Sequence, residues 1–553
     1  MKKYVNFAVA AKLVTLSRAA LVGLSVATMA ACGGGDGASA FTPLLTSTVV
    51  LGSGIIAGND RDASGIASFK GIPYAAPPVG DLRWKAPQPV ASWTTPRDAK
   101  QYGNKCWANG TPAPVVADAS VSEDCLYLNV WTGAEKTSER RPVMVWLHGG
   151  GFQFGTSGDP RWEGANLAKK GVVVVSLNYR LGVFGHLARA DLSAESGGKG
   201  SGMYGLQDHL AALQWVKVNI ASFGGDPGNI TLMGESAGAH AVGMLSASPI
   251  ATGAFHKAIG ESGAFWESEF GPMPTRVAAE QKGQALGITL GASSLAALRA
   301  LPALQLAVAT NAAAPPFAPP FGPHLDGYVL TEDPAVRFAA GRQNDVPLLV
   351  GQNVAEGNIF AVPGRALPNT AAGFSAVQAR VFGSASLPEL SAFYPLATDA
   401  QAAPSSVQLL GDLIIGLQTW TWGASQKATG KAPVYAYYFK QTSAYTPLAV
   451  HVSEVPYMFQ NLIPKGTTAV PVLPGAQDHA LADTMSSYWT NFAKTGNPNQ
   501  TGLPNWPAYS GAGGTVMGLG AVVAAEPEPF TARYQFLNRF RNASGGLTIS
   551  FAP

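Results

Sequence analysis

The stretch "NITLMGESAGAHAVGML", residues 229–245, centres on a serine with a glycine two positions to either side. The apolar residues before Ser236 favour a β-strand, and the small residues after it favour a helix. A strand, a tight turn and a helix in this order are typical of a nucleophilic serine. Side chains two positions from such a turn would collide, and Gly234 and Gly238 remove the collision. Because the chain holds 64 glycines, the pattern alone also fits a glycine-punctuated loop.

Short apolar runs with β-character recur on both sides of this stretch, and helical patterns such as residues 204–220 lie between several of them. The runs cover residues 142–147, 171–179, 229–234, 257–263, 346–351 and 433–439. Apolar strands that alternate with helices predict an α/β fold with a large, mostly parallel central sheet and helices on both faces. In such sheets, ligands bind beyond the carboxyl ends of the strands.

Three of these carboxyl ends carry residues that suit catalysis. The run 142–147 is followed by "HGGGF", in which three consecutive glycines allow close backbone approach to a bound group and direct N–H groups towards it. A merely flexible loop is the alternative. Ala237, directly after the serine, would supply one more N–H. The run 346–351 is followed by Glu356, which fits the chain order serine, acid, histidine but alone would more often be a surface acid.

That chain order leaves two of the eight histidines as the base, His451 and His479. His479 lies in a predicted helix start, where a histidine is commonly solvated or part of a cap. His451 lies in an irregular stretch after the predicted strand 433–439, from which a loop could reach the serine. We therefore favour His451.

The composition narrows the class of protein. Charged residues make up 13% of the 553 residues, the net charge is +3, and no stripe of Lys and Arg appears. Nucleic-acid binding is therefore not expected. Residues 48–553 contain neither a linker nor an internal repeat, so we predict a single domain there.

The N-terminus has the features of an export signal over residues 1–31, with a basic segment followed by a 13-residue apolar run that is too short to span a membrane. Cys32 follows small residues, as in bacterial lipoproteins, and is the predicted lipidation site. Ordinary cleavage near Ala31 is the alternative. Residues 32–47 are predicted to be a flexible tether. We expect an exported protein in the periplasm or at the cell surface, lipid-anchored to the outer membrane or otherwise secreted.

The other two cysteines, Cys106 and Cys125, are compatible with a disulfide in an oxidising compartment. Two free buried thiols are the alternative.

Many motifs in this order resemble those of the type-B carboxylesterases, the cholinesterase-like branch of the α/β-hydrolases. The resemblance runs from about residue 65 to residue 509, which is most of the chain expected after export. The motifs are "GIASFKGIPYAAPPVGDLRWKAPQP" (65–89), "SEDCLYLNVW" (122–131), "VMVWLHGGGFQFG" (143–155), "VVVSLNYRLGVFGHL" (173–187), residues 205–238, "FHKAIGESG" (255–263), "HVSEVPYMF" (451–459) and "WTNFAKTGNPN…WPAY" (489–509).

The resemblance implies an α/β-hydrolase fold and serine ester hydrolysis through an acyl-enzyme, with neither a metal nor an organic cofactor. It implies that Ser236 is the nucleophile, Glu356 the acid and His451 the base, and that the N–H groups of Gly150, Gly151 and Ala237 are the oxyanion donors. It also implies a disulfide between Cys106 and Cys125. Structural ion pairs are implied for Arg83 with Glu123 and for Arg180 with Asp208.

The sequence departs from the family pattern in two places. Ala355 precedes Glu356 where an acidic residue is usual, and Trp107 adjoins the first cysteine of a short disulfide loop. No aromatic site for a quaternary ammonium is evident, so cholinesterase specificity is not expected.

We expect a small-molecule ester as substrate, and the sequence predicts no oligomeric state. Phe152, Phe154 and Trp266 are candidates for the pocket wall. Amidase, lipase and cinnamoyl-ester hydrolase activities stay open. A non-catalytic surface adhesion module of the same fold is disfavoured, because such members lose the nucleophile.

Overall fold

The computed structural model describes residues 45–107, 120–264, 273–311, 321–361, 366–467 and 470–540. The predicted export signal, Cys32 and Trp266 lie outside the described residues. Leu45, near the end of the predicted tether, is buried and its N–H donates to the Glu135 carbonyl over 2.7 Å. The packed chain thus includes residues before position 48.

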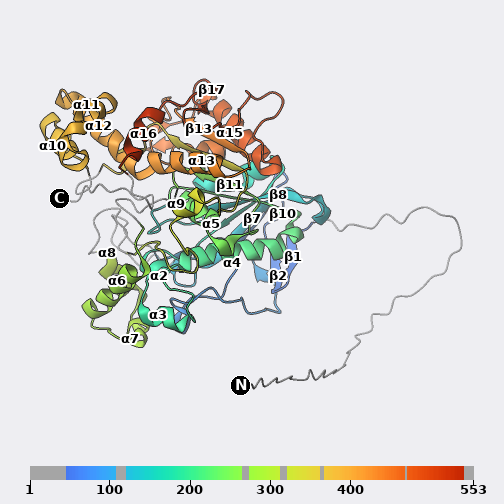
Figure 1. Ribbon diagram of the computed structural model, residues 1–553. Helices are drawn as coiled ribbons and strands as arrows, with labels where there is room; N and C mark the ends of the chain where they lie inside the picture. Colours follow the sequence, from blue (N-terminus) through green and yellow to red (C-terminus); the bar gives the residue numbers. More distant parts are fainter. Residues whose placement is uncertain are drawn as a thin grey trace, which may run out of the picture. The chain divides into compact units, whose positions relative to one another are not determined.

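Within the described residues, a sheet of ten strands has the order β17-β16-β13-β12-β11-β10-β8-β9-β7-β3. Figure 1 labels several of these strands, among them β8, β10 and β11. The strands from β9 to β16 in this order are parallel, and antiparallel pairings lie only towards the two edges. This confirms the predicted α/β-hydrolase architecture.

The strands of this sheet are β3 (Ala67–Pro73), β7 (Tyr127–Thr132), β8 (Arg141–Leu147), β9 (Val173–Leu177), β10 (Gly225–Glu235), β11 (Lys257–Glu261), β12 (Leu348–Asn353), β13 (Val434–Phe439), β16 (Thr515–Leu519) and β17 (Ala524–Pro527). The short strands outside it are β1 (Thr48–Leu51), β2 (Gly54–Ala57), β4 (Arg97–Asp98), β5 (Lys105–Cys106), β6 (Val121–Ser122), β14 (Lys465–Gly466) and β15 (Pro471–Val472).

The α-helices are α1 (Ala165–Ala168), α2 (Gly182–His186), α3 (Ala190–Glu195), α4 (Tyr204–Asn219), α5 (Ala237–Ser246), α6 (Arg276–Thr289), α7 (Leu295–Ala300), α8 (Ala303–Asn311), α9 (Pro334–Ala339), α10 (Ala371–Phe382), α11 (Leu387–Phe393), α12 (Asp399–Gly411), α13 (Leu417–Thr429), α14 (Val455–Met458), α15 (Ala476–Thr495) and α16 (Thr531–Asn538). A π-helical turn at Asp412–Gly416 joins α12 to α13.

The two faces of the sheet bury different helices. Along β8, Val143 and Val145 join a core with residues of α4 and α5, whereas Met144 and Trp146 join a second core with residues of α15. Successive side chains of a strand point to opposite faces, so a continuous apolar run is what a doubly covered strand requires. Among the described residues, no helix combines the length and apolar character needed to cross a membrane.

The ion pairs implied by the resemblance are present; the pair of Arg180 with Asp208 is buried, and the pair of Arg83 with Glu123 is partly buried. Arg83 Nε donates to Glu123 Oε2 over 2.7 Å. Arg180 donates to Asp208 through Nε over 2.8 Å and through Nη2 over 2.7 Å. Arg180 lies just after β9 and Asp208 on α4, so this pair fixes the strand's exit to the helix that covers the sheet.

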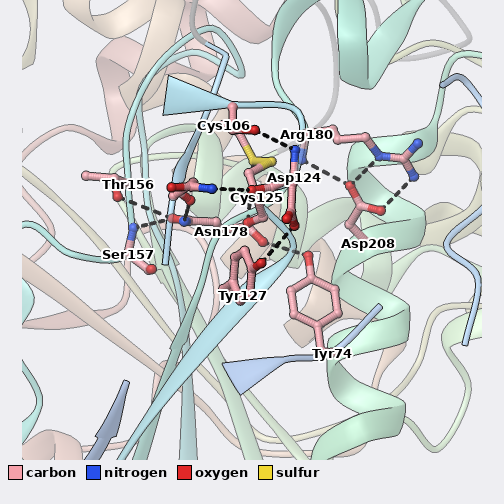
Figure 2. The surroundings of a disulfide bond; sticks show 12 residues. Tyr74, Cys106, Asp124, Cys125, Tyr127, Thr156, Ser157, Asn178, Arg180 and Asp208 are labelled. Atoms are coloured by element: carbon pink, nitrogen blue, oxygen red, sulfur yellow. Dashed lines mark hydrogen bonds and ion pairs between the residues drawn. A yellow bond between two sulfur atoms is a disulfide. The ribbon is translucent and has the colours of Figure 1, made fainter. Parts of the chain in front are cut away.

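Cys106 and Cys125 form a disulfide, with Cα atoms 5.0 Å apart (Figure 2). Both cysteines are buried. Next to the disulfide, Asn178 Nδ2 donates to the Asn104 carbonyl over 2.8 Å, and Tyr74 Oη donates to the Asn178 carbonyl over 2.6 Å. The disulfide therefore ties the Cys106 segment to the start of β7, and the hydrogen bond between Asn178 and Asn104 ties it to the carboxyl end of β9.

Removal of this disulfide is expected to lower the free energy of unfolding and to leave the catalytic rate little changed. In the chain-entropy model, a crosslink between positions 19 residues apart contributes about 3 kcal/mol. A Cys106→Ser/Cys125→Ser double variant should therefore lose about that much free energy of unfolding in urea, with kcat little changed. Peptide mapping without reduction should recover the linked pair from the parent protein. Two alkylatable thiols in the native parent would contradict the assignment.

Candidate active site

Ser236 lies at the sharp turn between β10 and α5. Its φ of 54° and ψ of −124° fall in a sparsely populated region that costs energy for a residue with a side chain. A Cβ on Gly234 would lie 2.5 Å from the carbonyl carbon of Gly238, and one on Gly238 would lie 2.0 Å from the Leu147 oxygen. The two glycines are thus required by close backbone approach, as the sequence predicts.

The glycine loop after β8 lies against this turn. A Cβ on Gly149 would lie 3.0 Å from the Cβ of Ser236. Gly150 and Gly151 have φ values of 109° and 60°, which favour glycine. Within the described part of the chain, the N–H groups of Gly150, Gly151 and Ala237 have no hydrogen-bond acceptor. These three donors are therefore available to a bound oxyanion.

Glu356 and His451 come together beyond the carboxyl end of β12. An isolated bridge pairs Ala355 with Val450, and the Ala355 N–H donates to the Ala449 carbonyl over 3.0 Å. This pairing places His451 Nδ1 2.6 Å from Glu356 Oε2. Both side chains are buried. The backbone N–H of Ala355 thus makes the hydrogen bond to Ala449, even though the side chain at position 355 departs from the family pattern.

The other ring nitrogen of His451 faces the turn that carries Ser236. His451 Nε2 lies 3.1 Å from Glu235 Oε1, and Glu235 directly precedes Ser236. Burial lowers the pKa of His451, but the carboxyls of Glu235 and Glu356 outweigh it, so the pKa lies above its ordinary value. No hydrogen bond joins the Ser236 hydroxyl to another described residue, which leaves it able to turn towards His451.

Sequence reasoning missed a set of buried carboxyls around this pair. Glu235, Glu261 and Glu454 all lie within the same buried region as Glu356. Burial raises the pKa of Glu235 and of Glu261 above the ordinary range. The only sequence signal was the repeated Gly-Glu-Ser, at residues 234–236 and again at 260–262.

The candidates for the pocket wall occupy different surroundings. Phe152 is 5% exposed, and its ring packs edge-on against His186, 5.5 Å away, within the core. Phe154 is half-buried, and its ring lies against Gly150. The structure adds Phe360, which the sequence did not suggest and whose ring centroid lies 5.2 Å from that of His451.

The alternative base, His479, lies in the first turn of α15 and is exposed, as its predicted helix start implies. Among the residues that the structure describes, no group of three or more His, Cys, Asp or Glu side chains is arranged to hold a metal ion.

Comparison with known proteins decides the family. The profile of the carboxylesterase family matches residues 45–537. The chain belongs to the carboxylesterase family. It is 37% identical to a fumonisin B1 esterase of Sphingopyxis macrogoltabida, over 86% of both chains. It is 35% identical to a para-nitrobenzyl esterase of Bacillus subtilis, over 86% of this chain and 95% of the other.

Solved carboxylesterase structures agree with this assignment. A carboxylesterase of Geobacillus stearothermophilus superimposes with a TM-score of 0.76 at 31% identity, covering 89% of this chain and 99% of the other. A structure of a p-nitrobenzyl esterase covers 88% of this chain and 99% of its own, with a TM-score of 0.74 at 34% identity. The protein is therefore a carboxylic ester hydrolase with the α/β-hydrolase fold.

This carboxylesterase buries several histidines near its glycine loop. The ring of His148 stacks on that of Tyr179 with centroids 4.4 Å apart, and the Tyr179 ring contacts His209 at 4.3 Å. Burial lowers the pKa of His148 to about 4 and that of His186 to about 3. These side chains are neutral in the folded state at neutral pH, whereas in the unfolded chain they protonate near pH 6.5.

Replacement of His186 should therefore reduce the carboxylesterase's sensitivity to acid. The stability associated with the neutral ring is present above about pH 6.5 and is lost as the pH falls towards the folded pKa of about 3. His186 Nδ1 lies 3.1 Å from the Gly202 carbonyl, and an asparagine amide would retain a donor there. Relative to the parent, His186→Asn should gain about 3 kcal/mol of unfolding free energy between pH 7 and pH 4.

Urea unfolding at several pH values measures this difference. The buried carboxyls contribute equally to the pH dependence of both proteins, so their contribution cancels in the comparison. His479→Asn, at an exposed position, is the control and should run parallel to the parent. A pH-independent difference between His186→Asn and the parent would contradict the burial argument.

Proposed function

We propose that this carboxylesterase hydrolyses esters through an acyl-enzyme on Ser236, with His451 as the base and Glu356 as its acidic partner. One observation supports this most strongly. The 2.6 Å contact between His451 Nδ1 and Glu356 Oε2 leaves Nε2 on the side of Glu235, the residue next to the strained serine. An imidazole held by a carboxylate beside a serine is the arrangement that serine hydrolases use.

The chemistry follows from these groups. His451 Nε2 takes the hydroxyl proton as Ser236 Oγ attacks the ester carbonyl, and Glu356 stabilises the resulting imidazolium. The N–H groups of Gly150, Gly151 and Ala237 bind the oxyanion, and one such donor is typically worth about 2.7–4 kcal/mol of barrier. The imidazolium returns its proton to the leaving alcohol. Water, activated by the same imidazole, then releases the acid.

The surroundings of His451 favour an ester with an apolar group near the reacting carbonyl. Phe360 packs beside the imidazole and belongs to an apolar cluster with Leu410, Ile414 and Ile415. Two relatives of this chain carry the names fumonisin B1 esterase and para-nitrobenzyl esterase. We therefore place the substrate among esters with a bulky apolar alcohol or acyl group.

A hydrolysis screen tests the substrate class. It compares p-nitrophenyl esters of increasing acyl length, p-nitrobenzyl acetate, a cinnamoyl ester and a matched anilide. We expect ester turnover, with kcat/KM rising as apolar groups are added, and little anilide turnover. A preference for the anilide would favour an amidase. No hydrolysis of any ester by correctly folded protein would contradict the proposed function.

We also propose that the mature protein is exported and anchored through Cys32. The support is the sequence of residues 1–31 followed by that cysteine. Labelled palmitate should enter the parent protein, and Cys32→Ser should prevent labelling and release the esterase from membranes. A mature N-terminus elsewhere without lipid would indicate a secreted enzyme instead.

A further inference from the structure

The base of the proposed triad lies in a loop that needs support from other parts of the chain. Strand β13 ends at Phe439, α14 begins at Val455, and His451 lies between them. The bridge between Val450 and Ala355 fixes only the last part of this loop. Exposed residues of the loop include Thr442, Ala444, Pro447 and Leu448. A displacement of about 1 Å at a catalytic group can cost about 10²-fold in rate, so the loop must be held closely.

Asp478, in the first turn of α15, binds the chain on both sides of this loop. Its Oδ1 accepts hydrogen bonds from Gln441 Nε2 over 2.9 Å and from Ser443 Oγ over 2.8 Å, both before His451. The same oxygen accepts from Tyr457 Oη over 2.6 Å, and Tyr457 follows His451 on α14. One carboxylate oxygen thus joins the chain before the base to the chain after it.

The donors of this cluster converge on Asp478. Tyr457 has one hydroxyl hydrogen and gives it to the carboxylate, so Thr446 Oγ1, 2.9 Å from Tyr457 Oη, donates to the tyrosine. Ser443 Oγ accepts the backbone N–H of Thr446 over 2.9 Å and passes its own hydrogen to the carboxylate. Because Thr446 lies nearer in sequence to His451, the support from Asp478 extends into the middle of the loop.

The cluster suits an ionised carboxylate. Burial raises the pKa of Asp478, but its hydrogen bonds, that of Tyr457 foremost, outweigh this effect, so the pKa lies below its ordinary value. Hydrogen bonds to an ionised acceptor are about twice as strong as those between neutral groups. Asp478 therefore holds the loop more firmly than a neutral acceptor would.

The carboxylate is itself fixed to a packed part of the fold. Asp478 Oδ2 accepts the N–H of Gly475, which precedes α15, over 2.9 Å. Farther along this helix, Trp489 is buried in one cluster with Met233 of β10. Strand β10 leads directly into the turn at Ser236. The helix that holds the base loop therefore packs against the strand that carries the proposed nucleophile.

We propose that Asp478 is a positioning residue that ties the His451 loop to α15 and so keeps the imidazole aligned with Glu356. This inference rests on the proposed triad. Without the carboxylate, the three donors lose their common acceptor, and the loop can shift away from α15. The 2.6 Å contact between His451 Nδ1 and Glu356 Oε2 would then lengthen, and proton transfer from Ser236 would slow.

The two oxygens of Asp478 have separate roles, and two substitutions distinguish them. Asp478→Ala removes both oxygens, so kcat on p-nitrophenyl acetate should fall by about 10- to 100-fold, with KM within about twofold. Asp478→Asn keeps an acceptor for the three donors but turns an amide towards the Gly475 N–H. Its kcat should therefore stay within about threefold of the parent, while its free energy of unfolding falls. A residue that only caps α15 would lose stability in both variants and kcat in neither.

Tyr457→Phe deletes one of the three donors and leaves the ring in place. It should lower kcat by about three- to tenfold, as expected for the loss of one hydrogen bond. Asp483→Ala is the matched control, because this second carboxylate of α15 is exposed and binds Lys170 and Gln460 instead of the loop. Its kcat should be unchanged.

The proton between His451 Nδ1 and Glu356 reports the alignment of the imidazole. Its low-field ¹H NMR signal is identified by its absence from His451→Gln. We expect this signal in the parent, in Asp478→Asn and in Asp483→Ala, and we expect it to be shifted or lost in Asp478→Ala. Full kcat in Asp478→Ala would overturn the positioning role, and so would a loss of kcat with an unchanged signal.

Tyr457→Phe keeps the proposal falsifiable if Asp478→Ala does not fold, because full kcat in Tyr457→Phe would also overturn it. Failure of the triad itself is distinguishable. If Ser236→Ala or His451→Gln retained activity, the proposed function would fail. If both were inactive while Asp478→Ala was fully active, only this inference would fail.

Discussion

Ser236→Ala is expected to lower kcat by at least ~10⁴-fold while the protein keeps its fold. The substitution removes only the Oγ atom, which makes no hydrogen bond to the described residues. The elbow itself is maintained by Gly234 and Gly238, whose missing side chains allow the backbone to approach Leu147. Alanine at φ 54° carries about the same backbone strain as serine, so the unfolding free energy should change little.

Initial rates on p-nitrophenyl acetate, together with urea unfolding of the same preparation, measure both parts of this prediction. Ser246→Ala, at the other end of α5, is the control for loss of a serine hydroxyl from this helix. Activity of Ser236→Ala within tenfold of the parent, in a preparation free of contaminating esterase, would rule out this serine as the nucleophile.

Much of this fold could be predicted from local sequence because each central strand is an apolar run followed by a distinctive segment. The run 142–147 matches β8, and the serine stretch matches β10 and α5. A strand covered by helices on both faces of the sheet needs apolar residues throughout, and a sharp turn needs glycine. Both requirements can therefore be recognised in the sequence.

The residues around the site were only partly predictable. Glu356 and His451 were suggested by chain order, since both follow strands whose carboxyl ends meet at one edge of the sheet. Phe360 lies four residues after Glu356, but nothing in its neighbours indicates that its ring faces His451. Phe152, a candidate for the pocket wall, has a positive φ, and its ring packs against His186.

The clustering of buried glutamates near His451 could not be predicted from the sequence, for a different reason. Ser262, Asn353 and Glu454 come from separate parts of the chain and meet only through the order of β11 and β12 and the loop beyond β13. Taken singly, a glutamate is expected on the surface. Its protonation depends on burial among partners, which no local pattern reports.

Replacement of His451 should reduce activity nearly as much as loss of Ser236, because the groups of a catalytic triad act together and their effects do not add. His451→Gln is the sharper variant. Its amide keeps a donor for Glu356 and most of the side-chain volume, but it has no basic nitrogen. We expect kcat to fall by at least ~10⁴-fold. His479→Ala, at the exposed start of α15, should stay within about twofold of the parent.

The pH profile provides an independent test of the same residue. His451 must be neutral to accept the serine proton, and its neighbouring carboxyls raise its pKa above the ordinary value of about 6.5. The acid limb of kcat/KM should therefore lie above pH 6.5. Glu235→Gln removes a carboxyl 3.1 Å from Nε2, so it should move that limb to lower pH. If His479→Ala were inactive and His451→Gln active, His451 could not be the base. Its contact with Glu356 would then have no part in proton transfer.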